Sequence, residues 1–251
     1  MLRQQLRYLL CAMGFFTRIP LPAWVGYQHD DLDRAAPYFP LIGLLVGAIA
    51  VGAWWLAGQF WPARMALLIS LIVTVLITGA FHEDGLADSC DGFGGGYQRA
   101  DVLRIMHDSR IGSFGAIALI LALLLKLETL ATLPAAWLPV ALLAGHAASR
   151  RAAVSLLARP DYVRPEGKSK PLATRLGGTG LILASLFGGL PLLALPPGTA
   201  LLALAALLLM RQLLARYYRH RLGGYTGDAL GMAQQVSELA FYLALSACLS
   251  T

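Results

Sequence analysis

Three aspartates, Asp84, Asp88 and Asp91, are spaced four and three residues apart in the polar segment 82–96. On a helix that advances about 100° per residue, their carboxylates fall within about 60° of arc and face the same way. Like charges at this spacing repel, so an ordered helix needs protonation, nearby arginines or a cation between them. A hard divalent cation such as Mg²⁺ suits the arrangement, because it prefers oxygen ligands and shares its coordination shell with substrate phosphates. The spacing therefore predicts a magnesium site for phosphoryl transfer.

The residues that follow extend this predicted site. Asp108 is expected to complete the metal shell and, like Asp91, is a candidate acceptor for a proton from the substrate. The candidate substrate-binding residues are Arg99, Arg104 and Arg110, which could pair with phosphates, and Gly94 and Gly95, which would let a phosphate approach the backbone. The alternatives are a solvated acidic face, simple glycine turns and arginines that flank a membrane span, and the residues alone leave both interpretations open.

Two acids near the C-terminus form a second candidate wall of a substrate site. Asp228 opens the last apolar run and Glu238 lies about two turns inside it. They are about 80° apart around a helix and roughly 15 Å apart along it, so they are not expected to bind one ion together. Glu238 is expected to face a polar cavity, with pairing to an arginine as the structural alternative. Lys126 and Glu128, in the third apolar run, are expected to snorkel toward the interface.

The elements that must position these residues are apolar helices. Apolar residues make up 57% of the 251 residues and charged residues only 14%, which excludes a disordered chain and a nucleic-acid-binding module. Without strand alternation of the barrel type, the expected fold is an all-α polytopic membrane bundle in one domain, residues 1–251. Seven runs are long enough to be expected to cross the bilayer: 38–58, 65–82, 112–131, 136–155, 178–196, 199–215 and 229–249. The three cysteines are widely spaced and suggest neither a disulfide framework nor a zinc site.

Charge distribution predicts the orientation of this bundle. With the N-terminus inside and the C-terminus outside, every Lys and Arg except Arg64 and Lys126 lies on the cytoplasmic side, including those of the basic loop 159–175. The first sixteen residues are expected to form an interfacial helix, since no small-residue cleavage site follows them. The acidic segment 83–111 is too charged to span, so it is expected to lie at the cytoplasmic face of the inner membrane.

Three motifs carry a resemblance to a known family. They are D-G-L-A-D-x-x-D-G over 84–92, D-S-R-I-G over 108–112 and T-G-D over 226–228. With F-T-R-I-P over 16–20 and Y-F-P-L-I-G over 38–43, they make most of the chain resemble the cobalamin synthase family, the adenosylcobinamide-GDP ribazoletransferases of corrinoid biosynthesis. The resemblance implies a Mg²⁺-dependent membrane enzyme that joins adenosylcobinamide-GDP to α-ribazole, or its 5′-phosphate, with release of GMP. It also implies other late enzymes of that pathway as protein partners.

Two other functions remain to be weighed. The acidic motif is also similar to that of the CDP-alcohol phosphotransferases, but Asp88 stands where that family has arginine and no second half of its motif follows. A corrinoid or cation transporter would also be a polytopic bundle with acidic residues. Transporters place their ionisable groups near the bilayer midplane, whereas nearly all the acids here are expected at or beyond the cytoplasmic boundary, with Glu238 the main exception.

Overall fold

The computed structural model describes residues 2–26, 31–158 and 176–249, and this part of the chain is helical without strands. The basic segment 159–175 lies outside the described residues. The helices are α1 (Leu2–Phe16), α2 (Asp31–Ala35), α3 (Phe39–Ala57), α4 (Ala63–Thr78), α5 (Phe81–Gly95), α6 (Arg99–Met106), α7 (Ser113–Ala131), α8 (Leu138–Val154), α9 (Gly178–Gly189), α10 (Pro197–Leu222) and α11 (Gly227–Leu249), with short 3₁₀ turns between some of them.

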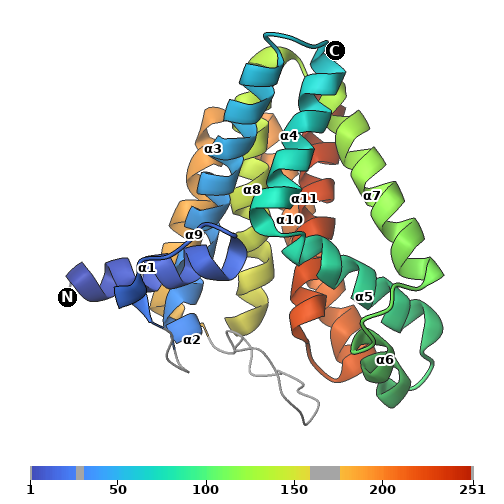
Figure 1. Cartoon of the computed structure of the whole chain (residues 1–251). Helices are drawn as coiled ribbons and strands as arrows, with labels where there is room; N and C mark the ends of the chain where they lie inside the picture. The colour runs from blue at the N-terminus through green and yellow to red at the C-terminus, as the bar shows by residue number, and fades with distance from the viewer. Residues whose placement is uncertain (1, 27–30, 159–175, 250–251) are drawn as a thin grey trace.

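Each of the seven predicted apolar runs forms a helix, in the order α3, α4, α7, α8, α9, α10 and α11. The long helices run side by side as a bundle, and α5 and α6 extend from its lower end (Figure 1). Among the described residues, three helical segments are long and apolar enough to cross a membrane: Asp31–Ala57, Ser113–Ala131 and Pro197–Leu222. This identifies the fold as an all-α bundle of membrane type, while the expected count of seven spans stays a prediction.

A sharp corner separates α4 from α5. The two helices would pass as one span only with a bend of 87° between them. Gly79 (φ 65°) and Ala80 (φ 57°) both have left-handed backbone angles at this corner, and the Arg18 guanidinium packs where a side chain of Gly79 would stand. Because of this bend and its four acids, we treat α5 as lying outside the membrane-spanning segments.

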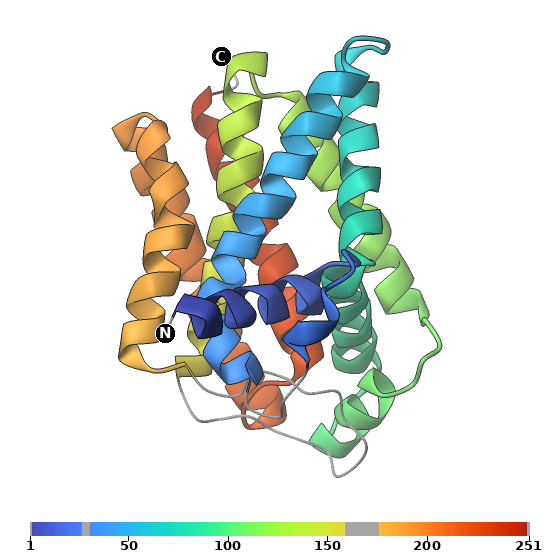
Figure 2. The ribbon, with the colours of Figure 1, turned by 60° about the vertical axis from the view of Figure 1, so that its left-hand side comes forward.

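α1 lies across the bundle rather than along it (Figure 2). Its buried residues, Tyr8, Cys11, Ala12 and Phe16, recur at helical spacing and face the core, whereas most of its other residues are exposed or half-buried. Arg7 ties it to the next helix through an ion pair with Asp31. The predicted N-terminal amphipathic helix is therefore present.

The apolar core has two parts. One gathers α1, α2, the start of α3, α6 and the adjoining ends of α8, α10 and α11. The other gathers the remaining halves of α3, α8, α10 and α11 with α4 and α7. The polar residues buried in the middle of α8 and α11 lie where these two parts meet.

Candidate active site

The acidic motif forms one continuous helix, α5, so Asp84, Asp88 and Asp91 share a helix as predicted. Asp84 is exposed, Asp88 is half-buried and Asp91 is buried. Partial burial and, to a smaller extent, three nearby negative charges together raise the pKa of the Asp88 carboxyl from 3.8 to about 7. Those charges belong to Asp84, Asp228 and Asp91, in decreasing order of effect. We call Asp84, Asp88 and Asp228 the carboxylate set.

Asp228 reaches this set because α11 crosses α5 in backbone contact. A Cβ atom added at Gly85 would lie 2.9 Å from the carbonyl oxygen of Asp228 and 3.0 Å from the Cα of Gly231. The Oγ1 atom of Thr226 accepts a hydrogen bond of 3.2 Å from the Ala229 N–H and caps the first turn of α11. The sequence suggested Asp228 as a substrate-binding residue only, whereas the structure adds it to the acids of α5.

Asp91, predicted as a metal ligand, anchors a neighbouring helix. Its two oxygens accept hydrogen bonds from the N–H groups of Gly112 (2.7 Å) and Gly115 (2.8 Å) at the start of α7. A carboxylate is favourable there, because the first N–H groups of a helix lack intrahelical partners and carry partial positive charge. Metal ligation by Asp91 would have to use the remaining lone pairs of these oxygens.

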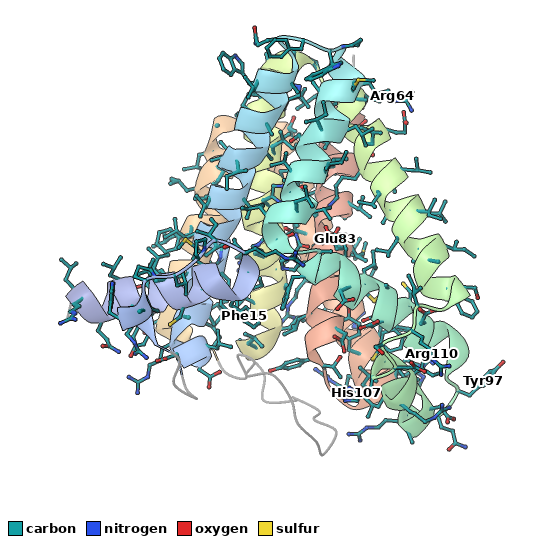
Figure 3. The ribbon with its side chains drawn as sticks, in the orientation of Figure 1. Phe15, Arg64, Glu83, Tyr97, His107 and Arg110 are labelled. Carbon is teal, nitrogen blue, oxygen red and sulfur yellow. The ribbon has the colours of Figure 1, made fainter. Side chains whose placement is uncertain are left out.

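Asp108, the fourth predicted ligand, lies in the exposed turn between α6 and α7, near the labelled His107 and Arg110 of Figure 3. Its carboxylate pairs with Arg110, whose Nε and Nη2 donate at 3.0 and 2.7 Å. These hydrogen bonds, with one from the backbone N–H of Arg110, lower the pKa of Asp108 to about 2. The four predicted ligands are therefore not gathered at one point, because a salt bridge holds Asp108 and a helix end holds Asp91.

The predicted phosphate-binding arginines differ in position. Arg104 pairs with Asp101 of its own helix at 3.4 Å, and both side chains are exposed. The guanidinium of Arg99 lies 3.4 Å from where a Cβ of Gly223 would stand, beside the turn that leads to Asp228. Of Arg99 and Arg104, Arg99 is thus the one placed next to the α10–α11 turn.

One basic residue near the motif escaped the sequence analysis. Arg221 of α10 donates from Nη2 to the carbonyl oxygens of Phe93 (3.1 Å) and Gly96 (2.6 Å), at the end of α5. A cation is favourable at a helix C-terminus, whose last carbonyl groups lack intrahelical partners. Its sequence position, more than a hundred residues from α5, offered no signal for this contact.

The glycines of the motif allow close helix packing. A Cβ at Gly94 would lie 2.6 Å from the ring of Phe114, and one at Gly96 would lie 2.6 Å from the backbone nitrogen of Val102. Gly95 has only the end of the Ile105 side chain near it, at 3.2 Å. These contacts explain the glycines through the packing of α6 and α7 on α5, and phosphate contact at Gly94 and Gly95 stays a prediction.

Glu238 is fully enclosed in a buried polar network. Its Oε1 lies 3.3 Å from Lys126 Nζ and accepts a hydrogen bond from the Tyr242 hydroxyl at 3.1 Å, while Oε2 accepts one from Gln234 Nε2 at 2.6 Å. Lys126 is only 3% exposed, so the expectation that it snorkels is wrong. Glu238 was expected to face a polar cavity, with an arginine as the alternative partner, whereas it pairs with this lysine because α7 and α11 pack side by side and a buried carboxylate needs a cation.

The network continues to the start of α5. Lys126 Nζ donates to Gln235 Oε1 (2.9 Å), and Gln235 Nε2 donates to Glu83 Oε1 (3.0 Å). Figure 3 places Glu83 in the middle of the molecule, where α5 begins. Lys126, Gln235 and Glu83 were missed as members of one network, although a lysine inside an apolar run was a signal that it needed a buried partner.

The described acids around Asp88 match Mg²⁺ in donor chemistry, although they form no dense cluster. Among residues 2–26, 31–158 and 176–249, no three His, Cys, Asp or Glu side chains are grouped so that they could hold a metal ion. The carboxylate set nevertheless supplies the oxygen donors that Mg²⁺ prefers, and the charges of Asp84 and Asp228 both act on Asp88. Since Mg²⁺ is usually held by one or two carboxylates plus substrate phosphates, the donor chemistry fits.

Comparisons with known proteins agree with the motifs. The family model described as cobalamin-5-phosphate synthase matches residues 8–246. The chain is 53% identical to an adenosylcobinamide-GDP ribazoletransferase of Ralstonia pickettii (strain 12J), over 100% of this chain and 99% of the relative. It is 55% identical to the protein of that name from Ralstonia nicotianae, over 95% and 94%, and 47% identical to one from Shewanella sp. (strain W3-18-1), over 96% and 94%. No solved structure matches the chain.

Proposed function

The chain belongs to the cobalamin-5-phosphate synthase family, and we propose that it joins adenosylcobinamide-GDP to α-ribazole or α-ribazole 5′-phosphate. A ribazole hydroxyl oxygen would form a bond to the phosphorus nearest the cobinamide. The bond from that phosphorus to the oxygen of the departing GMP would break, and the hydroxyl proton would leave. The observation that carries this proposal is the crossing of α5 and α11, which places Asp228 beside Asp84 and Asp88.

We propose that one or two carboxylates of the carboxylate set hold Mg²⁺ together with phosphate oxygens of the substrate. The ion would supply charge stabilisation at the reacting phosphorus and at the leaving phosphate. Two features support this assignment: the acids belong to helices in backbone contact, and the charge of Asp84 acts on Asp88 one helical turn away.

The surrounding residues would orient the substrates. Arg99, beside the turn that leads to Asp228, would pair with the diphosphate. Arg110 neutralises Asp108, and Asp91 fixes the start of α7 through its two backbone hydrogen bonds. Because Arg110 lowers the pKa of Asp108 and both oxygens of Asp91 accept backbone hydrogen bonds, we assign acceptance of the hydroxyl proton to the carboxylate set instead.

We also propose how the chain lies in the membrane. All seven apolar helices would span, with α1 in the interface, the N-terminus in the cytoplasm and the C-terminus outside the inner membrane. Arg64, at the start of α4, lies at one end of the bundle and Arg110 at the other (Figure 3). Since α5 and α6 lie at the Arg110 end, this orientation would present the carboxylate set to the cytoplasm.

The test is product formation by purified protein in detergent, where transport cannot be observed. GMP release from adenosylcobinamide-GDP should require both α-ribazole and Mg²⁺. CMP release from CDP-diacylglycerol, with no turnover of the corrinoid, would instead support the phosphotransferase that the motif also resembles. Binding of the corrinoid without any phosphate product would favour a carrier.

A further inference from the structure

An aromatic pocket lies where α1, α3, α5, α8 and α11 meet. Four phenyl rings line it, those of Phe15, Phe16, Phe39 and Phe81, and we call it the phenyl pocket. The rings face one another closely: Phe16 and Phe39 pack edge to face with centroids 4.5 Å apart, and Phe15 and Phe81 do so at 4.9 Å. The open space among these side chains measures about 40 Å³, so a ligand larger than a water molecule requires the rings to move.

Two polar side chains join this apolar lining, His82 and Arg150. The His82 ring stacks on Phe16, with centroids 5.1 Å apart. Arg150 is 3% exposed, and its guanidinium lies 5.8 Å from the centre of the Phe16 ring. Its Nη1 donates to the carbonyl oxygen of His146 at 2.9 Å, whereas its Nε has no hydrogen-bond partner within the described part of the chain.

An unpaired buried donor costs roughly 1–3 kcal/mol, and more when it belongs to a charged group. Arg150, one of the residues that line the phenyl pocket, therefore carries a buried donor that lacks an acceptor among the described residues. A ligand that brings one acceptor atom into an otherwise apolar pocket would satisfy it.

The phenyl pocket adjoins the carboxylate set. Gly231, which crosses Gly85 in backbone contact, is part of its lining, as is Gly227, the residue before Asp228. His82 comes two residues before Asp84 on α5. A ligand in the pocket would therefore lie directly beside the acids that we assign to phosphoryl transfer.

We propose that the phenyl pocket binds the base of the acceptor nucleoside, an inference that rests on the proposed function. The base of ribazole is a benzimidazole with two methyl groups and one free ring nitrogen. Its planar apolar body matches four phenyl rings, and its single acceptor nitrogen matches the unpaired Nε of Arg150. The pocket is narrow, so we expect the rings to rotate as the base enters.

Guanine, the base of the other substrate, fits the lining less well. Its edge carries a carbonyl oxygen, a ring N–H, an amino group and further ring nitrogens, which need several polar partners when buried. Among the described residues that line the pocket, the polar side chains are those of His82 and Arg150. The chemistry of the lining therefore selects the dimethylbenzimidazole over the guanine.

The experiment measures KM for each substrate separately, with full-length protein in detergent. Phe16→Leu removes a ring and keeps an apolar side chain, and Arg150→Lys keeps the charge and removes Nε. We expect each to raise KM for α-ribazole about tenfold while KM for adenosylcobinamide-GDP changes less than twofold. Phe15→Leu, at a half-buried ring, repeats the test should Phe16→Leu fold poorly. Phe187→Leu on α9, outside the pocket, is the matched control and should leave both constants unchanged.

Equilibrium dialysis of α-ribazole, without the corrinoid substrate, separates this inference from the proposed function. Weaker binding to the folded Phe15→Leu, Phe16→Leu and Arg150→Lys proteins supports the pocket assignment even where no turnover is seen. A raised KM for adenosylcobinamide-GDP alone would overturn it in favour of the guanine. Unchanged ribazole binding in these folded variants would overturn it, because the phenyl rings would then pack in the apolar core without contacting the base.

Discussion

Gly85 of α5 and Gly231 of α11 meet in backbone contact, so closely that a Cβ on either would lie 3.0–3.1 Å from the Cα of the other. This contact joins segments about 150 residues apart in the chain. It brings Asp228 to Asp84 and Asp88, and it also forms one wall of the phenyl pocket. The positions of the carboxylate set and of the phenyl pocket thus both depend on the contact between two glycines.

Gly85→Ala should separate the two helices and impair the carboxylate set. The new Cβ would meet backbone atoms, which cannot rotate away, so we expect a loss of about 1–3 kcal/mol in stability and at least a tenfold loss of turnover. Thermal unfolding and GMP release measure the two effects. Gly52→Ala on α3 is the control, because nothing lies within 4 Å of its Cβ. Equal behaviour of the two variants would contradict the role given to the crossing.

Asp84→Asn and Asp88→Asn should fold and insert normally but lose at least a hundredfold in Mg²⁺-dependent turnover, since each removes a charged oxygen donor from the proposed ion site. GMP release at saturating Mg²⁺ is the readout. Asp101→Asn, which removes an exposed acid on the neighbouring helix α6, should retain activity. Near-normal turnover in either Asp84→Asn or Asp88→Asn would argue strongly against the carboxylate set.

Asp91→Ala should differ from these variants by losing stability even without Mg²⁺. Two N–H groups at the start of α7 would lose their acceptor, at a cost of about 1–3 kcal/mol. Thermal unfolding in the presence of a chelator tests this, with Asp84→Ala as the comparison. If Asp91 were a metal ligand without a structural role, Asp91→Ala and Asp84→Ala would both differ from wild type in stability only when Mg²⁺ is present.

Asp88 makes the stability of the protein depend on pH. Its pKa is raised from 3.8 to about 7 in the folded protein, so the folded state binds more protons than the unfolded state between these values. Without a divalent cation, the stabilisation that accompanies protonation is complete below pH 3.8 and is lost as pH rises toward 7. Tm should therefore fall from pH 5 to pH 8, and less so in Asp88→Asn. Mg²⁺ should raise Tm more at pH 8 than at pH 5, and an equal rise at both would count against ion binding to Asp88.

Glu238→Gln should destabilise the bundle by about 3–5 kcal/mol, because it leaves the buried ammonium of Lys126 without its ion-pair partner. Adding Lys126→Met should restore part of that loss, since the double variant no longer buries the charge of the lysine. Thermal unfolding of the single and double variants gives the coupling between the two residues. Glu128→Gln, whose pair with Arg64 is exposed, should change stability by less than 1 kcal/mol.

Much of this molecule follows from local patterns in the chain. Runs of apolar residues predict helices wherever backbone groups need internal partners, and all seven runs are helical. The spacing of Asp84, Asp88 and Asp91 places them on one helix because helical periodicity depends only on neighbouring residues. The resemblance of the motifs to a known family then implied the substrates, adenosylcobinamide-GDP and α-ribazole.

The partners of these residues depend on how helices pack, which spacing along the chain does not specify. Asp91 is turned to α7, Asp228 joins the acids of α5, and Lys126 pairs with Glu238. Each of these relationships joins different helices, and each exists because one helix crosses another at a particular residue. A periodic pattern tells which face of a helix is polar, but the neighbour that meets this face is set by close packing across the whole bundle.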